Sequence, residues 1–144
     1  MFSIAKKYKV NEKLASEGFW YTPSLCSDYG DKPPQFKLGR KHLRTNRKYQ
    51  AKVTRYALEN RRNLNRPTAA RYAKADAIEL QVFCETVLLN WRNMFDEEGH
   101  EITYTVEQGV ALMNECPDLY EELDDVASDR QNYTEGDVDD IAGK

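Results

Sequence analysis

Apolar residues recur at helical spacing through the middle of the chain. Residues three and four positions apart lie on one face of an α-helix, so this spacing predicts a core helix of about 25 residues that begins near Thr68. Its expected apolar face comprises Tyr72, Ala75, Ala77, Ile78, Val82, Phe83, Val87, Leu88, Trp91 and Phe95. We expect the other helices to pack against it.

Shorter helices are predicted on both sides of this segment. One begins near Arg40 or Lys41, and it ends where the asparagines and proline of "NRRNLNRP" (60–67) interrupt it. Thr105 with Gln108 three residues later matches a capping box, which predicts a helix from Val106. Pro117 is favoured at a first helical position, so a further helix is predicted over 117–133. The apolar stripes of the first and last helices are Tyr49, Val53, Tyr56 and Ala57, and Leu119, Tyr120, Leu123 and Val126.

The N-terminal quarter of the chain has a different pattern. Residues 1–16 show no clear periodicity and are expected to be irregular. The aromatic run at 19–21 favours a strand that Pro23 ends, and Phe36 and Leu38 alternate with polar residues. These features predict a hairpin-like element over 17–38. The expected fold is mainly α with a small N-terminal β-hairpin, a compact helical domain of about four helices over 1–133, followed by an acidic disordered tail over 134–144.

Composition indicates a soluble globular protein. With 144 residues the chain is expected to form one domain. No apolar run approaches the roughly 18 residues of a membrane span, and the N-terminal lysines precede no apolar segment of the kind found in secretory signals. Three widely spaced cysteines, Cys26, Cys84 and Cys116, are typical of free thiols in a reducing cytoplasm.

Charge is distributed very unevenly along the chain. Residues 37–74 hold 13 Lys and Arg against one acid, a net charge of +12, whereas residues 96–144 hold 16 Asp and Glu against two bases, a net charge of −14. Interleaved with tyrosines, the basic region could contact the phosphates of nucleic acid. The acidic half of the chain favours the alternative, a solvated or intramolecularly paired helix face. The candidate basic face is Arg40, Lys41, Arg44, Arg47, Lys48, Lys52 and Arg55.

Candidate catalytic chemistry is sparse. His100 lies in the acidic segment 96–101, but its spacing does not match a calcium-binding EF-hand loop, and a solvated loop is the preferred interpretation. His42 has no recognisable nucleophile or carboxylate pattern around it, and the glycines are too scattered to form a phosphate loop. We therefore expect no enzymatic activity, no metal site and no cofactor.

Several weak motifs occur together in one order. "KKYKVNEKLASEGFW" (6–20) precedes the basic region, and "ETVLLNWRNM" (85–94) with Trp91 precedes an acidic turn at 96–99. Then follow "YTVE" (104–107), "PDL" (117–119) and "ASDRQNY" (127–133). In this order the chain resembles the tail assembly chaperones of long-tailed bacteriophages over most of its length, although "PSLCSDYGDKPPQFK" (23–37) departs from the family's compact glycine turn.

The resemblance implies a non-enzymatic assembly factor. Such a chaperone would bind the tape-measure protein, promote assembly of the tail-tube protein around it and act in the cytoplasm of the infected host cell, without remaining in the mature virion. Self-association stays open, and neither a membrane nor nucleic acid is an expected partner. The alternatives are a structural tail or head-tail connector protein of the virion, and a nucleic-acid-binding phage protein that uses residues 37–74.

A client surface can be proposed on the last helix, where an apolar stripe lies among dense acids. It comprises Leu119, Tyr120, Leu123 and Val126, together with Trp91 and Phe95. The alternative is that this stripe packs on the long helix as part of the core.

Overall fold

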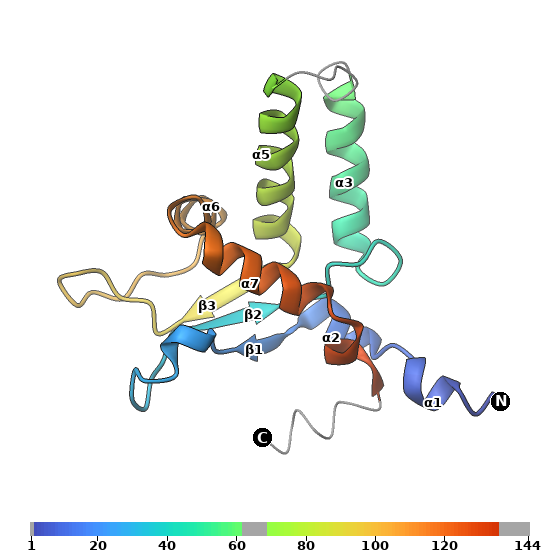
Figure 1. The fold of residues 1–144 in the computed structure, drawn as a ribbon, viewed down its shortest axis with the longest axis horizontal. Helices are drawn as coiled ribbons and strands as arrows, with labels where there is room; N and C mark the ends of the chain where they lie inside the picture. Colours follow the sequence, from blue (N-terminus) through green and yellow to red (C-terminus); the bar gives the residue numbers. More distant parts are fainter. Residues whose placement is uncertain (1, 62–68, 136–144) are drawn as a thin grey trace.

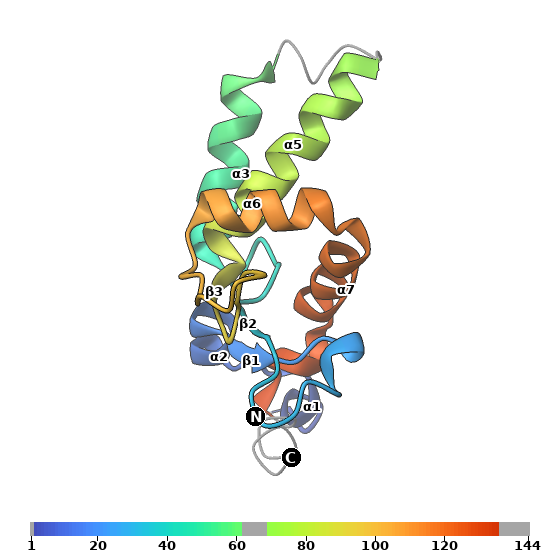
Figure 2. The ribbon, with the colours of Figure 1, turned by 90° about the vertical axis from the view of Figure 1, so that its left-hand side faces the viewer.

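A computed structural model describes residues 2–61 and 69–135. A three-stranded antiparallel sheet of order β1-β2-β3 forms the base of the molecule, and the helices α5, α6 and α7 lie on one side of it (Figure 1). Two antiparallel helices, α3 and α5, extend away from this body (Figure 2). The chain is therefore a mixed α/β domain, and the expectation of a mainly helical fold is wrong.

The sheet joins segments that are far apart in the sequence. Strand β1 (Phe19–Tyr21) pairs with β2 (Gln35–Leu38), which also pairs with β3 (Leu88–Arg92). Along β2 the side chains alternate as a one-sided sheet requires, with Phe36 and Leu38 buried and Gln35 and Lys37 half-buried. Phe36 meets Trp91 of β3 edge to face, with ring centroids 6.2 Å apart.

The long helix predicted from Thr68 to Phe95 does not form as a single element. Helix α5 spans Ala69–Thr86, and the chain then turns into β3. A short, continuous apolar run fits a buried strand as well as a helix, and periodicity does not separate the two. Pairing with β2 decides the outcome, because it buries Leu88 and Trp91 against the core while satisfying the backbone of both strands.

The remaining helices are short. They are α1 (Ala5–Tyr8), α2 (Glu12–Glu17), α3 (Arg47–Glu59), α6 (Val106–Glu115) and α7 (Pro117–Ser128), with single 3-10 turns at Ser24–Cys26 and Arg130–Tyr133. The predicted starts of α6 and α7 are confirmed, since the Thr105 hydroxyl accepts the Gln108 N–H at 3.1 Å and Pro117 is the first residue of α7. Residues 1–16, expected to be irregular, contain α1 and all of α2 except its last residue, Glu17.

Helix α3 begins later than predicted. Asn46 is its N-cap, with Oδ1 accepting the Tyr49 N–H at 3.2 Å, so Arg40, Lys41 and Arg44 precede the helix. The Asn46 amide group also donates to the carbonyl of Thr86, a residue 40 positions away. Asn is a favoured N-cap residue, so the sequence does offer a local signal for this helix start, whereas the contact with Thr86 does not show in it.

The core lies between the sheet and the helices α5, α6 and α7. It comprises Phe36, Leu38, Leu80, Phe83, Cys84, Val87, Leu88, Trp91, Met113, Leu123 and Ala127. Tyr133 is fully buried beside it, and Thr134 is also buried and bridges Val10. Thr134, the first residue of the tail predicted over 134–144, is thus packed against the rest of the chain. Residues 136–144 of that tail fall outside the described residues.

Gly18 joins α2 to β1 and lies directly against the backbone of β2. Its φ of +78° and ψ of 178° suit glycine alone, and an added Cβ would lie 2.7 Å from the Leu38 carbonyl carbon and oxygen. We predict that Gly18→Ala lowers the free energy of unfolding by about 2–6 kcal/mol, from strain of about 1–3 and overpacking of about 1–3. Gly99→Ala is the control, because Gly99 has a φ of +86° but open space around it. Urea unfolding that gives equal losses for the two variants would refute the close contact.

Candidate partner-binding surface

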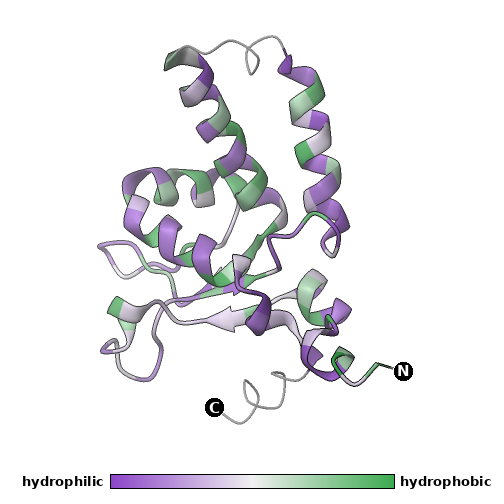
Figure 3. Ribbon diagram, turned by 45° about the vertical axis from the view of Figure 1, so that its right-hand side comes forward, coloured by the Kyte–Doolittle hydropathy of each residue, from purple (hydrophilic) through white to green (hydrophobic). Residues whose placement is uncertain are grey.

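The antiparallel helices α3 and α5, here called the hairpin, stand clear of the body (Figures 1 and 2). This pair of helices is distinct from the β-hairpin predicted over 17–38. No side chain of α3 is buried, and Leu58 near its end is 68% exposed. Apolar and polar positions are mixed along both helices (Figure 3). The hairpin therefore presents apolar groups that the body does not cover.

One edge of the hairpin is closed by a polar clasp on Glu85. Its carboxylate accepts the Tyr56 hydroxyl at 2.9 Å and the Gln81 amide at 2.7 Å, and it forms an ion pair with Lys52 at 3.0 Å. Partial burial would raise the pKa of Glu85, but these bonds outweigh it and hold the pKa below its ordinary value. The clasp ties α3 to α5 through charge rather than through apolar packing.

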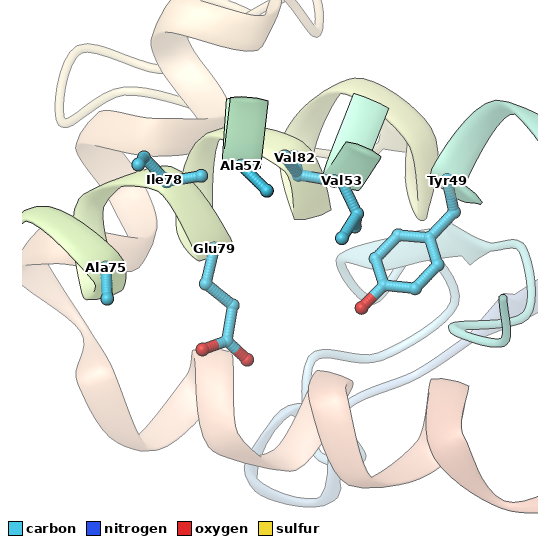
Figure 4. A pocket seen from close by; sticks show the side chains of 7 residues that line it. All are labelled: Tyr49, Val53, Ala57, Ala75, Ile78, Glu79 and Val82. Atoms are coloured by element: carbon cyan, nitrogen blue, oxygen red, sulfur yellow. The ribbon is translucent and has the colours of Figure 1, made fainter. Parts of the chain in front are cut away.

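Beside the clasp the two helices enclose a small apolar space, here called the hairpin hollow. It is lined by Tyr49, Val53, Ala57, Ala75, Ile78, Glu79 and Val82 (Figure 4). Its volume is about 190 Å³, whereas small-molecule sites usually measure about 300–1,000 Å³. Among its lining residues only Glu79 is charged. The hollow therefore has the size and polarity to take one or two apolar side chains of another polypeptide.

A second space lies on the other side of α5, between that helix and the junction of α6 and α7, and is here called the acidic hollow. It is lined by Ala73, Asp76, Ala77, Glu79, Leu80, Met113, Asn114, Pro117, Tyr120, Glu121 and Asp124, with a volume of about 500 Å³. Four of these residues are carboxylates, and none is Lys or Arg. Glu79 lines both hollows, so α5 forms the ridge between them.

Lys41 anchors the base of this region. Its Nζ lies 2.8 Å from Glu79 Oε1 and 2.7 Å from Asp124 Oδ1, so one ammonium joins the segment before α3 to α5 and α7. Burial alone would lower the pKa of Lys41, but the two carboxylates outweigh it and raise the pKa above its ordinary value. Lys41 thus remains charged, and it shows how a cation is bound at this surface.

The six residues predicted for client binding lie mostly against the core. Leu123 is fully buried, and Trp91 is 6% exposed and donates its indole N–H to the Ile102 carbonyl at 2.7 Å. Leu119, Tyr120 and Val126 are half-buried and pack on the same core. Phe95, at 53% exposure, is the exception. A role for the set in partner binding stays a prediction, and Tyr120 is the one member that lines a hollow.

The predicted basic face does not form a single helical stripe. Arg40 is buried, and Lys41, Lys52 and Arg55 form ion pairs within the chain, the last with Glu59 at 3.0 Å. Arg44, Arg47 and Lys48 are exposed around the start of α3. Three of the seven bases in the predicted face are therefore paired with acids of the same chain.

The acidic loop brings Asp96, Glu98 and His100 together, with ligand atoms within 4.8 Å of one another and all three residues exposed. Asp96 Oδ1 already accepts the N–H groups of Glu98 and His100, at 2.9 and 2.8 Å, in an ordinary turn. We assign no ion to it. The three cysteines are free thiols, and among the described helices none is long and apolar enough to cross a bilayer.

The depressed pKa of Glu85 predicts a pH dependence of stability. A carboxylate whose pKa is lower in the folded state stabilises that state above its unfolded pKa of about 4.5, and the contribution is lost as pH falls through the folded value. Glu85→Gln should therefore lower stability at neutral pH and make the free energy of unfolding depend less steeply on pH below about 4.5. The control is Glu115→Gln, at an exposed carboxylate on α6. If the free energy of unfolding fell equally steeply with pH below about 4.5 in the wild type and in Glu85→Gln, the clasp would be contradicted.

Comparison with known proteins gives one match. No curated protein and no solved structure matches the chain. A family model described as "YdaY prophage protein" matches residues 41–144, which include the hairpin, β3, α6 and α7. This match supports a phage origin for the chain, but it does not specify a tail assembly chaperone. The match covers well over half of the sequence, and the chain therefore belongs to the YdaY prophage protein family.

Proposed function

We propose that this chain is a non-enzymatic assembly factor of a phage particle, a tail assembly chaperone that holds a helical segment of the tape-measure protein. Membership of a prophage protein family supports the phage context. The observation that carries the proposal is the hairpin hollow, an apolar space between two helices that extend from the body.

The hollow has the construction of a helix-binding groove. Tyr49, Val53 and Ala57 recur every four residues on α3, and α5 faces them with its own apolar positions (Figure 4). An amphipathic helix docks in such a groove through apolar side chains one or two turns apart. Each apolar side chain that becomes fully buried contributes about 1.5–3 kcal/mol before the entropy of ordering is subtracted. A few such contacts give reversible binding, as a chaperone that releases its client requires.

The rest of the molecule suits this role. A tape-measure protein has long apolar helices that would aggregate alone, so a partner must cover them and remain soluble. Here the apolar surface is small and lies beside the dense carboxylates of α7. The sheet and α7 belong to the packed body from which the hairpin extends, and neither of them lines the hairpin hollow.

Co-expression with the tape-measure protein of the same phage tests the proposal. Wild-type chain should keep the tape measure soluble, and Ala57→Glu should reduce soluble tape measure to the amount seen without a chaperone, because an unpaired carboxylate would be buried at the contact. The matched control is Ala51→Glu, the same substitution at an exposed alanine on the outer side of α3.

Two results would contradict the proposal. One is a tape measure equally soluble without this chain. The other is the presence of this chain in purified virions at the copy number of a structural subunit, as mass spectrometry would detect, which would instead support a tail or connector protein.

A further inference from the structure

We infer that the segment bound by the hairpin is a basic amphipathic helix, whose Lys and Arg side chains pair with the carboxylates of the acidic hollow while its apolar side chains enter the hairpin hollow. This inference rests on the proposed function and adds to it the charge of the client.

The geometry makes the two hollows parts of one surface. On α5, Ala75, Ile78 and Val82 face the hairpin hollow, whereas Ala73, Ala77 and Leu80 face the acidic hollow. Glu79 borders both spaces and is exposed. Side chains two turns apart on a helix are separated by about 10 Å, the diameter of a helix such as α5. A partner helix that crosses α5 can therefore reach both hollows at once.

The charge of this surface is one-sided. Asp76, Glu79, Glu121 and Asp124 supply four negative charges, and Lys41 supplies one positive charge, which leaves a net charge of −3. Lys41 already uses one oxygen of Glu79 and one of Asp124. Asp76 and Glu121 are exposed and form no ion pair within the described part of the chain. An apolar or acidic partner would bury these carboxylates without a cation, at considerable cost in free energy.

The floor of the acidic hollow suits long basic side chains. Among the lining residues Leu80 and Met113 are buried and Tyr120 is half-buried, whereas the carboxylates Asp76 and Glu121 are exposed. Lysine and arginine bury their methylene stems against apolar surface while their charged ends reach outward. A space of about 500 Å³ has room for several such stems. Ion pairs at this exposed rim would set specificity and association rate more than total affinity, and salt would screen them.

The test uses the full chain and three synthetic helical peptides with one leucine stripe. Their polar positions are Lys, Gln or Glu, and binding is measured by fluorescence anisotropy at ionic strengths of about 0.01 M and about 1 M, where the Debye length is about 30 Å and about 3 Å. The Lys peptide should bind at least about tenfold more tightly than the Glu peptide at low salt, a difference of about 1.4 kcal/mol, and the preference should disappear at high salt.

Glu121→Lys should remove most of this preference, and Asp76→Lys provides a second variant on another helix. The matched control is Asp125→Lys, which alters an exposed carboxylate one turn along α7 that lines neither hollow and should leave the preference intact. Circular dichroism identifies any variant that fails to fold.

The outcomes separate this inference from the proposed function. Equal binding of the three peptides, abolished by Ala57→Glu, would overturn the basic-helix inference and leave the chaperone proposal standing. Binding of none of them would also overturn the inference, while the tape-measure co-expression decides the proposed function independently. A dimer in sedimentation velocity that Ala57→Glu dissociates would place a second copy in the hollow and overturn it as well.

Discussion

Backbone hydrogen bonds at the end of β2 join almost every part of the body. The N–H groups of Gly39, Arg40 and Lys41 donate to the carbonyls of Val87, Ala15 and Ala127, at 2.8, 2.8 and 2.9 Å, and the carbonyls of Leu38 and Gly39 accept the buried Tyr133 hydroxyl. Buried backbone groups cost free energy unless they are paired, so these hydrogen bonds are needed in the folded state. Through them residues 38–41 hold α2, the end of α5, α7 and the last 3-10 turn in place. Gly18 and Gly39 allow the chains to approach this closely.

Most of the buried contacts therefore lie in the body and not in the hairpin. The sheet, α6 and α7 share one buried core with the lower part of α5, whereas α3 has no buried residue and is held by the Glu85 clasp and by its contacts with α5. Segments with few buried contacts open at low free energy and commonly carry binding surfaces. The hairpin can therefore adapt to a partner while the body keeps its structure, and Lys41 links the two parts through Glu79 and Asp124.

Local signals in the sequence predicted the parts of the fold that depend on local chemistry. Thr105 and Pro117 start their helices through bonds and backbone restraints within a few residues, and the structure places both as expected. The α5–β3 boundary depends instead on pairing with a strand some 50 residues earlier, which an apolar run does not reveal. An apolar stripe such as that of α7 has the same sequence pattern whether it packs in the core or binds a partner. The sequence therefore did not reveal that Leu123 lies in the core.

The hairpin hollow could not be predicted either, although the apolar stripes that line it were recognised as stripes. The space is lined by side chains from two helices, among them the small Ala57 and Ala75, and it becomes evident only when α3 and α5 are placed side by side. The acidic hollow likewise combines Asp76 with Glu121, residues from separate helices. Counting charge along the chain predicted a basic and an acidic half and favoured a solvated or intramolecularly paired basic face. It did not show which residues pair, and the structure places Lys41 and Lys52 against acids on α5 and α7.

We propose that α3 is held loosely in the free protein and is covered by a client helix when the tape-measure protein binds. Amide hydrogen exchange, measured on the free chain and on the chain co-purified with the tape-measure protein, tests both parts of this proposal. The amides of α3 should exchange faster than those of β2 in the free chain, and their exchange should slow more than that of the sheet when the tape-measure protein binds. Unchanged exchange in α3, with protection gained elsewhere or not at all, would contradict it.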